Sequence, residues 1–244
     1  MSRILLISDL HLSGERPAIN QRFFDFLHVA ARQAAALYVL GDLFEYWIGD
    51  DELDAADGDP LGRQVADAFN ELSRAGVSVA LMRGNRDFLL GQRFCEAAGM
   101  RLLNDPFVVQ LEGTPTLLMH GDTLCTDDLD YQAWRRIARS DAWQREFLSK
   151  PLTTRLEEVR ALRERSKAKL ESMAAEIMDV NADAVREAFR THGVARLIHG
   201  HTHRPAHHQC EVDGRFCERW VMPDWYERGG YVAIESSVPR LAVF

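Results

Sequence analysis

Side chains that can bind metal ions follow short apolar runs at five places in this 244-residue sequence. Asp9 and His11 come after the run Ile4–Ile7, and Asp42 comes after a run that ends at Leu40. The other candidates are Asn85, His120, His201 and His203. Each has an ordinary structural explanation when taken alone, because Asp can cap a helix and Gly-Asp commonly ends a strand in a turn. Their recurrence in the same setting is what points to chemistry.

The donor atoms of these candidates are all nitrogen or oxygen, with no thiolate among them. This inventory favours Mn²⁺, Fe²⁺ or Zn²⁺ over a soft metal and over Mg²⁺ alone. About seven ligands are more than one ion needs, so we expect two. Two ions about 3.5–4 Å apart share a bridging carboxylate and can activate a hydroxide for in-line attack on phosphorus. The residues therefore predict a dinuclear metal centre for phosphoryl chemistry.

The apolar runs alternate with helical patterns, which is the rhythm of βαβ units. Residues 17–34 and 61–74 have the apolar spacing of amphipathic helices, and each lies between two short apolar runs. Ligands of open α/β sheets bind beyond the carboxyl ends of the strands, so we expect the candidates to meet at such an edge. Asp9 and His11 would share one side of an extended segment, as would His201 and His203.

The remaining elements follow from the same patterns. We expect strands at 4–7, 37–40, 77–82 and 195–198, helices at 88–98 and 181–190, and a hairpin of 107–111 with 116–119. Short strands at about 207–212, 216–222, 230–234 and 240–243 fit an antiparallel closing layer. The acidic stretch 50–59 is expected to be an exposed loop.

Residues 129–179 differ from the rest of the chain in composition, because they have helical periodicity and few residues that favour strands. Residues 131–170 carry a net charge of +6, which leaves −14 for the rest of the chain. We interpret 129–179 as a helical cap with a basic surface, inserted into a core made of 1–128 and 180–244. The alternative is a pair of solvated helices without a role.

Composition excludes several classes of protein. A net charge of −8 argues against a general nucleic-acid binder, which needs excess Lys and Arg. No apolar stretch reaches the roughly 18 residues of a membrane span, and the apolar start is too short for a secretory signal. The four cysteines form no Cys-x-x-Cys pair, so neither a structural zinc site nor a disulfide framework is expected. We expect a cytoplasmic protein with reduced thiols.

The candidate residues resemble the five sequence blocks of the calcineurin-like metallophosphoesterases. The matching strings are Asp9-Leu10-His11, Gly41-Asp42, Gly84-Asn85, His120 and Gly200-His201-Thr202-His203. The resemblance implies an α/β fold, a two-sheet sandwich flanked by helices with an inserted cap. It implies that one ion is bound by Asp9, His11, Asp42 and His203. It implies that a second ion is bound by Asp42, Asn85, His120 and His201.

Longer strings at 41–51, 84–91, 119–126 and 199–205 resemble the UDP-2,3-diacylglucosamine hydrolases of lipid A biosynthesis. That resemblance covers nearly the whole chain. It implies hydrolysis of the pyrophosphate bond of UDP-2,3-diacylglucosamine, by metal-activated hydroxide at the α-phosphorus, to UMP and 2,3-diacylglucosamine 1-phosphate. We expect two divalent ions, with Mn²⁺ as the metal, a lipid-linked nucleotide as substrate, and no nucleic acid. A basic cap also suggests peripheral contact with the cytoplasmic face of the inner membrane.

Two alternatives share the fold. A soluble nucleotide phosphodiesterase or pyrophosphatase would keep every metal ligand and differ only in substrate. A scaffold without activity would be free to lose ligands, and none is lost here.

One departure from the superfamily concerns Arg86, which stands where many members have His after Gly-Asn. That His assists the leaving group, so its absence suggests a leaving group that needs little protonation, such as a phosphate monoester. Arg86 can instead bind phosphate oxygens with its planar fork of donors. The catalytic roles are therefore expected at Asp42, Asn85, Arg86 and His201.

Substrate contacts are expected in the core and in the cap. Asn85, Arg86 and His201 are the core candidates, and Asp128 and Ser166 match polar positions of the hydrolase family. Two further family positions, polar or basic there, are Leu170 and Met173 here, so Lys167 and Lys169 are the candidate replacements. The apolar cap residues expected to cover acyl chains, or else to be plain core, are Trp134, Trp143, Phe147, Leu148 and Leu152.

Overall fold

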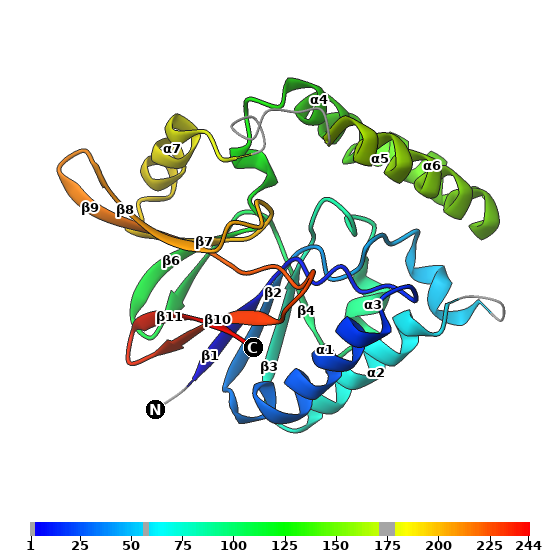
Figure 1. The fold of residues 1–244 in the computed structure, drawn as a ribbon, viewed down its shortest axis with the longest axis horizontal. Helices are drawn as coiled ribbons and strands as arrows, with labels where there is room; N and C mark the ends of the chain where they lie inside the picture. Colours follow the sequence, from blue (N-terminus) through cyan, green and yellow to red (C-terminus); the bar gives the residue numbers. More distant parts are fainter. Residues whose placement is uncertain (1–2, 56–58, 171–178) are drawn as a thin grey trace.

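Two β-sheets packed face to face form the centre of the molecule in the computed structural model, which describes residues 3–55, 59–170 and 179–244 (Figure 1). The first sheet has the strand order β11-β10-β1-β2-β3-β4. Its strands are β1 (Ile4–Ile7), β2 (Ala36–Leu40), β3 (Ser78–Met82), β4 (Arg101–Leu103), β10 (Gly230–Glu235) and β11 (Val238–Val243). The second sheet has the order β5-β6-β7-β9-β8. Its strands are β5 (Phe107–Leu111), β6 (Thr114–Met119), β7 (Arg196–His199), β8 (Ala206–Val212) and β9 (Arg215–Val221).

Helices cover the outer faces of both sheets. The helices α1 (Pro17–Val29), α2 (Leu61–Arg74) and α3 (Gln92–Ala97) pack on the first sheet, and α7 (Ala182–His192) packs on the second. The predicted α/β sandwich flanked by helices is therefore confirmed. The sequence also predicted the bounds of α2 to the residue.

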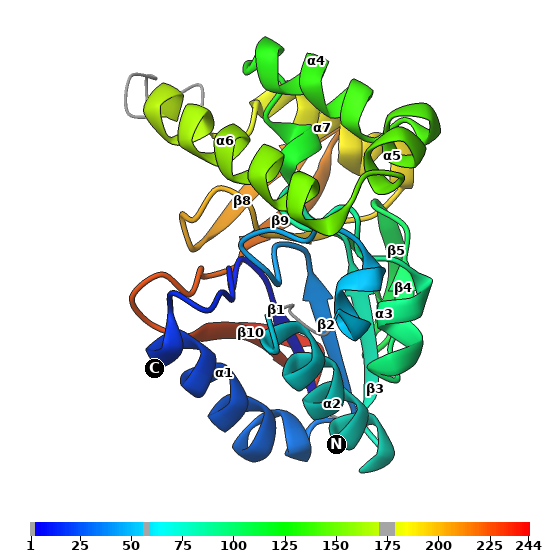
Figure 2. The same cartoon turned by 90° about the vertical axis from the view of Figure 1, so that its right-hand side faces the viewer.

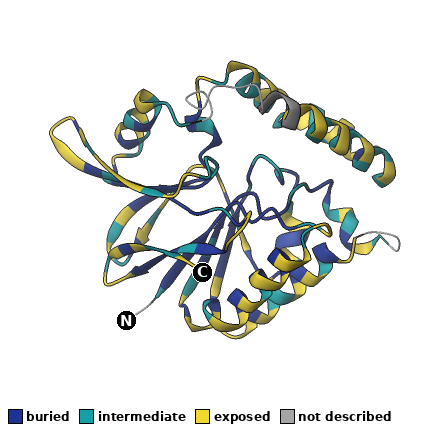
Figure 3. Ribbon diagram, in the orientation of Figure 1, coloured by how far each residue is buried: buried dark blue, intermediate teal, exposed yellow. Residues whose placement is uncertain are grey.

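Successive side chains of β1 point to opposite faces of the first sheet, and both faces are covered by an apolar layer. Leu5 and Ile7 belong to the apolar cluster under α1–α3, whereas Ile4 and Leu6 belong to the cluster between the two sheets. Successive side chains of a strand point to opposite faces, so a continuous apolar run fits a strand buried on both faces. Figure 3 shows the resulting buried interior along the central strands, with exposed positions mostly on the helices and hairpin tips.

The central strands of each sheet run parallel. Strands β1, β2, β3 and β4 pair in parallel in the first sheet, and β6, β7 and β9 do so in the second. Register places Leu40 beside Met82 and Met119 beside His199, so the strands of each sheet end together. The segments that follow β1, β2, β3, β6 and β7 all carry candidate ligands.

Three helices lie across the end of the sandwich toward which β2 points (Figure 2). They are α4 (Leu129–Ala138), α5 (Asp141–Leu148) and α6 (Leu152–Leu170). The first two begin at side-chain caps, because Asp128 accepts the Tyr131 N–H and Ser140 accepts the Trp143 N–H. We keep the division into a core at 1–128 and 180–244 and a cap at 129–179 as a prediction.

Part of the basic charge of the cap serves to attach it. Arg155 is 2% exposed and donates to Ile48 O at 2.6 Å and to the Asp51 carboxylate at 2.9 Å. Arg163 of α6 forms an ion pair with Glu45 in the segment after β2. The predicted basic surface would require the surplus basic residues to face solvent. Arg155 and Arg163 instead contact the segment after β2.

Two predicted elements differ from the structure. Residues 88–98 form a shorter helix, α3, because the Asp50 carboxylate accepts the N–H groups of Gly91 and Phe94 and so fixes the helix start. The stretch 50–59 is not simply an exposed loop: Asp50–Asp54 is a 3₁₀ helix, η2, with Leu53 buried, and 56–58 lie outside the described residues.

The predicted closing layer is also wrong. The last four strands divide between the sheets, with β8 and β9 in the second and β10 and β11 in the first. The short strand β4 was not predicted at all. Alternation identifies a strand but does not specify its partner, which is set by contacts far along the chain. No helix in the described parts of the chain is both long and apolar enough to cross a membrane.

Candidate metal centre

The segments after β1, β2, β3, β6 and β7 bring all seven predicted metal ligands together where the two sheets end. Asp9, His11 and His120 have no exposed surface, and Asp42 is 1% exposed. The donor atoms of Asp9, His11 and His203 lie within 4.8 Å of one another, as do those of Asp9, Asp42 and His120. The ligand roles themselves stay a prediction, and the distances show how well the side chains fit them.

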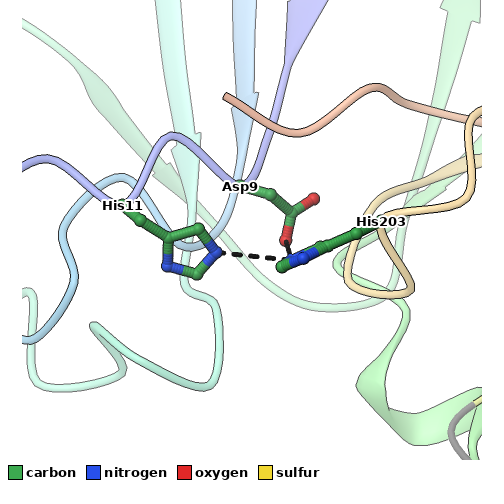
Figure 4. A group of neighbouring side chains, drawn as sticks. All are labelled: Asp9, His11 and His203. Atoms are coloured by element: carbon green, nitrogen blue, oxygen red, sulfur yellow. Dashed lines mark hydrogen bonds and ion pairs between the residues drawn. The ribbon is translucent and has the colours of Figure 1, made fainter. Parts of the chain in front are cut away.

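One set of donors surrounds a point beside Asp9 (Figure 4). His11 Nε2 lies 3.3 Å from His203 Nε2, and His203 Nε2 lies 3.4 Å from Asp9 Oδ1. His11 Nε2 lies 3.8 Å from Asp42 Oδ2. Asp9 Oδ1 is buried and accepts no hydrogen bond. A buried carboxylate oxygen without a donor, facing two imidazole nitrogens, suits a cation better than any hydrogen bond network.

A second set of donors surrounds Asn85. His120 Nε2 and His201 Nδ1 each lie 2.9 Å from Asn85 Oδ1, and His120 Nε2 lies 3.7 Å from Asp42 Oδ1. The two oxygens of Asp42 therefore face different sets, as the sequence predicted for a bridging carboxylate. The two sets fit the two ions in donor type and number.

Electrostatics at this centre favours positive charge. Burial lowers the pKa of His120, but the carboxylates of Asp42, Asp122 and Asp9 raise it to about 9 overall. The other ring nitrogen, Nδ1, donates to Leu40 O at 2.9 Å, which leaves Nε2 directed at the donor cluster. A bound divalent ion would supply the positive charge that these carboxylates attract.

The backbone at five of these ligands has positive φ, which non-glycine residues rarely adopt. The angles are 57° at Asp9, 50° at His11, 52° at Asp42, 69° at His201 and 54° at His203. These segments are therefore not extended, and the expectation that each i, i+2 pair shares one side of a strand was wrong in its reason. Strained backbone of this kind gathers at functional sites and is held by its surroundings. Here the Trp225 N–H donates to Asp9 O, and the His11 N–H to Asp42 O, at 3.0 Å each.

A cavity of about 540 Å³ opens between the ligand cluster and the cap. It is lined by the predicted substrate-binding residues Asn85, Arg86, Asp128, Ser166 and His201. The aromatic cap residues Trp134, Trp143 and Phe147 line it as well. The structure thus places candidate metal donors and apolar cap side chains around one pocket.

The other predicted cap residues do not line this cavity as expected. Leu148 is 39% exposed, and Leu152 lines a separate cavity near Phe44. The side chains of Lys167, Lys169 and Leu170 are outside the described part of the structure, and so is all of Met173. Asp128 has a second role, since its carboxylate caps α4.

Comparisons with known proteins identify the family. The calcineurin-like phosphoesterase family model matches residues 2–205. The chain is 48% identical over 239 residues to UDP-2,3-diacylglucosamine hydrolase of Aromatoleum aromaticum, covering 98% of this chain and 96% of that protein. The chain belongs to the calcineurin-like phosphoesterases, in the family of UDP-2,3-diacylglucosamine hydrolases. The hydrolase of that name from Pseudomonas entomophila is 48% identical over 243 residues, covering 99% of this chain and 98% of the relative. Family membership and the ligand cluster make this chain a metal-dependent hydrolase.

Sequence reasoning missed one residue that shapes the site of this phosphoesterase. The buried carboxylate of Asp87 accepts the N–H groups of Leu43 at 2.7 Å and Gly84 at 2.8 Å, and lies 3.3 Å from Asp42 N. It therefore holds the segments that carry Asp42 and Asn85 against each other. Burial, with the Asp42 charge nearby, raises the pKa of Asp87 to about 6. The string Gly84-Asn85-Arg86-Asp87 could have pointed to Asp87, but roles were predicted only for its Asn85 and Arg86.

Glu45 is a second missed residue. Its Oε2 lies 3.2 Å from His11 Nδ1, on the side of the ring away from the donor cluster. Carboxylates in this position orient a metal-binding imidazole in many proteins.

Gly84 makes the approach of Asn85 to Asp42 possible, and we expect Gly84→Ala to abolish metal binding. An added Cβ would lie 2.1 Å from Asp42 Oδ1 and 2.2 Å from Asp42 N, so the shared carboxylate must move. Metal content after gel filtration should fall to less than about a tenth of the parent value. Gly14→Ala is the control, because its Cβ would meet only the Asp59 side chain, at 3.1 Å. Full metal content in Gly84→Ala would contradict the shared role of Asp42.

Proposed function

We propose that this protein hydrolyses the pyrophosphate bond of UDP-2,3-diacylglucosamine to UMP and 2,3-diacylglucosamine 1-phosphate. The observation that carries the proposal is the lining of one cavity, which combines candidate metal donors and Arg86 with the aromatic side chains of Trp134, Trp143 and Phe147. A substrate with a pyrophosphate and two acyl chains matches both kinds of lining. Relatives at 48% identity bear the corresponding name.

We assign two divalent ions, with Mn²⁺ as the metal, to the two donor sets. Asp9, His11 and His203 would hold one ion, Asn85, His120 and His201 the other, and Asp42 both. When bound, two such ions supply an activated hydroxide and neutralise charge on the phosphates. The absence of thiolate and the four imidazoles favour Mn²⁺ over Mg²⁺.

The roles of the chain's own residues follow from their chemistry. Arg86 presents a planar fork of donors, suited to two oxygens of one phosphate. Asn85 Oδ1 and His201 Nδ1 lie 2.9 Å apart, and both residues line the cavity. They and Arg86 would stabilise charge on the phosphate that is attacked. No general acid is required, because a phosphate monoester leaves from a pyrophosphate as a stable anion.

The cap would bind the rest of the substrate. Asp128 and Ser166 offer polar contacts near the sugar and nucleotide, and Lys167 and Lys169 are proposed as basic contacts where the family pattern departs. Trp134, Trp143 and Phe147 would bury acyl chain, with roughly 25 cal/mol gained per Å² of apolar area removed from water.

We further propose that the cap touches the cytoplasmic face of the inner membrane, where the lipid substrate resides. On α4, Leu129 is 75% exposed and Ile137 is 55% exposed, so both aliphatic side chains are available to contact a lipid surface. Arg145 and Arg165 are also exposed. Each basic residue near an anionic surface contributes roughly 1 kcal/mol.

Asp42→Ala tests the activity. We expect a loss of about 10³-fold or more in hydrolysis of UDP-2,3-diacylglucosamine, because both donor sets lose a ligand. Product release should be measured with Mn²⁺, Mg²⁺ or chelator, next to a small chromogenic phosphodiester. Full activity of Asp42→Ala, with its circular dichroism unchanged, would disprove the two-ion proposal. Fast cleavage of the small diester with none of the lipid nucleotide would instead favour a soluble nucleotide phosphodiesterase.

Hydrolysis in heavy-oxygen water shows which phosphorus atom is attacked, because the attacking oxygen labels the product that contains it. Hydrolysis in that solvent should place the label in UMP, since attack is proposed at the α-phosphorus. Mass spectrometry of both products provides the measurement, and exchange of label into finished products is the control. Label in the lipid phosphate would refute attack at the α-phosphorus and leave the substrate assignment untouched.

Vesicle sedimentation tests the membrane contact. The protein should sediment with anionic vesicles at low salt and be released as salt screens the charges. Replacing both Leu129 and Ile137 by Ser should weaken binding, whereas Val29→Ser, a similarly exposed site on α1, should not. An absence of sedimentation with anionic vesicles would rule the contact out, and equal sedimentation with neutral vesicles would rule out a contribution from the basic residues.

A further inference from the structure

Helix α4 presents one face to the segments that carry the second donor set. Tyr131, Arg135 and Arg139 are spaced four residues apart, so they lie along one side of the helix. All three have contacts with the metal-site segments: Tyr131 and Arg135 with the Asp122 carboxylate, and Arg139 with the Gly84 carbonyl. None of the three was singled out from the sequence.

Tyr131 and Arg135 hold the segment after β6. The Tyr131 hydroxyl donates to Asp122 Oδ2 at 2.5 Å, and Arg135 Nε donates to the same oxygen at 2.7 Å. Asp122 is fully buried and follows His120 by two residues. Gln132 of the same helix donates to Asp122 O at 2.8 Å. The position of His120 is thus tied to α4 through a buried carboxylate and a main-chain carbonyl.

Arg139 and the ring of Tyr131 reach the other two members of the set. Arg139 Nη2 donates to Gly84 O at 2.8 Å, which is the carbonyl directly before Asn85. The Tyr131 ring stacks near the His201 ring, with centroids 6.1 Å apart and planes inclined by 29°. Asn85, His120 and His201 therefore all have a neighbour that is held by the cap.

The first donor set is braced from a different part of the chain. Arg16, just before α1, donates to His11 O at 3.0 Å and to Trp225 O at 2.8 Å. The Tyr226 ring stacks on His11 with centroids 4.9 Å apart and lies 5.1 Å from the His203 ring. These contacts come from the core. The cap reaches this set through α6 and not α4, because Arg163 of α6 pairs with Glu45, whose Oε2 lies 3.2 Å from His11 Nδ1.

We propose that α4 positions the ligands of one ion only, the ion held by Asn85, His120 and His201, while the Arg16–Tyr226 pair positions those of the other. Tyr131, Arg135 and Arg139 are positioning residues in this scheme, acting through Asp122 and the Gly84 carbonyl. The inference rests on the two-ion site proposed above. Its consequence is that α4 and the second ion are coupled: ordering one favours the other.

Metal binding in the absence of substrate tests this directly. Mn²⁺ titration calorimetry, with electron paramagnetic resonance to detect a coupled ion pair, should give two binding classes in the parent. Tyr131→Phe and Arg139→Gln should each weaken one class by about tenfold or more and leave the other unchanged, because supporting groups contribute about 10–100-fold to metal affinity. Tyr226→Leu should weaken the opposite class. Arg136→Gln is the matched control, since Arg136 is an exposed neighbour on α4.

The outcomes separate the two proposals. A parent protein that binds a single equivalent overturns the two-ion site, and the inference with it. A parent that binds two, with both classes weakened equally in Tyr131→Phe and Arg139→Gln, or neither weakened, overturns only the role of α4. Recovery of the weakened class in Arg139→Lys, which can still donate to the Gly84 carbonyl, would support positioning by that hydrogen bond.

Discussion

The burial of clustered carboxylates and imidazoles is the constraint on which this structure depends. Carboxylate oxygens and imidazole nitrogens from separate segments lie within 4.8 Å of one another, and Asp9, His11 and His120 have no exposed surface. Such a cluster raises the free energy of the fold unless a cation occupies it or the surrounding structure holds it. Here the holding groups are mostly main-chain hydrogen bonds and charged side chains, namely the buried Asp87 and Asp122 and the half-buried Arg16.

The two-sheet arrangement follows from the same constraint. The first sheet supplies Asp42 and Asn85, and the second supplies His120 and His201, so the second donor set exists only where the sheets meet. The apolar layer between the sheets, which includes Leu6, Leu40, Leu118 and Ile198, fixes their separation. Close packing transmits small displacements, so a change in that layer would be felt at the ligands.

The ligands could be predicted from the sequence because their signal is local: a donor directly after an apolar run, repeated along the chain. The strands other than β4, and helix α2, were predicted for the same reason. The division of β8–β11 between two sheets could not be predicted, because pairing depends on residues more than a hundred positions away, as for Ile4 and Ile234. The positive φ of the ligands was missed because Asp and His, although enriched at positive φ, adopt it in only a small minority of cases. Asp87 was missed because its partners include N–H groups of a distant segment.

The hydrogen bond from the Arg86 N–H to Asp42 Oδ1, 2.8 Å long, fixes where the Arg86 side chain begins relative to the shared carboxylate. The guanidinium is thereby anchored close to the shared carboxylate, where its proposed role at the attacked phosphate requires it. A displacement of the Asp42 carboxylate would therefore disturb both donor sets and the proposed phosphate-binding side chain at once.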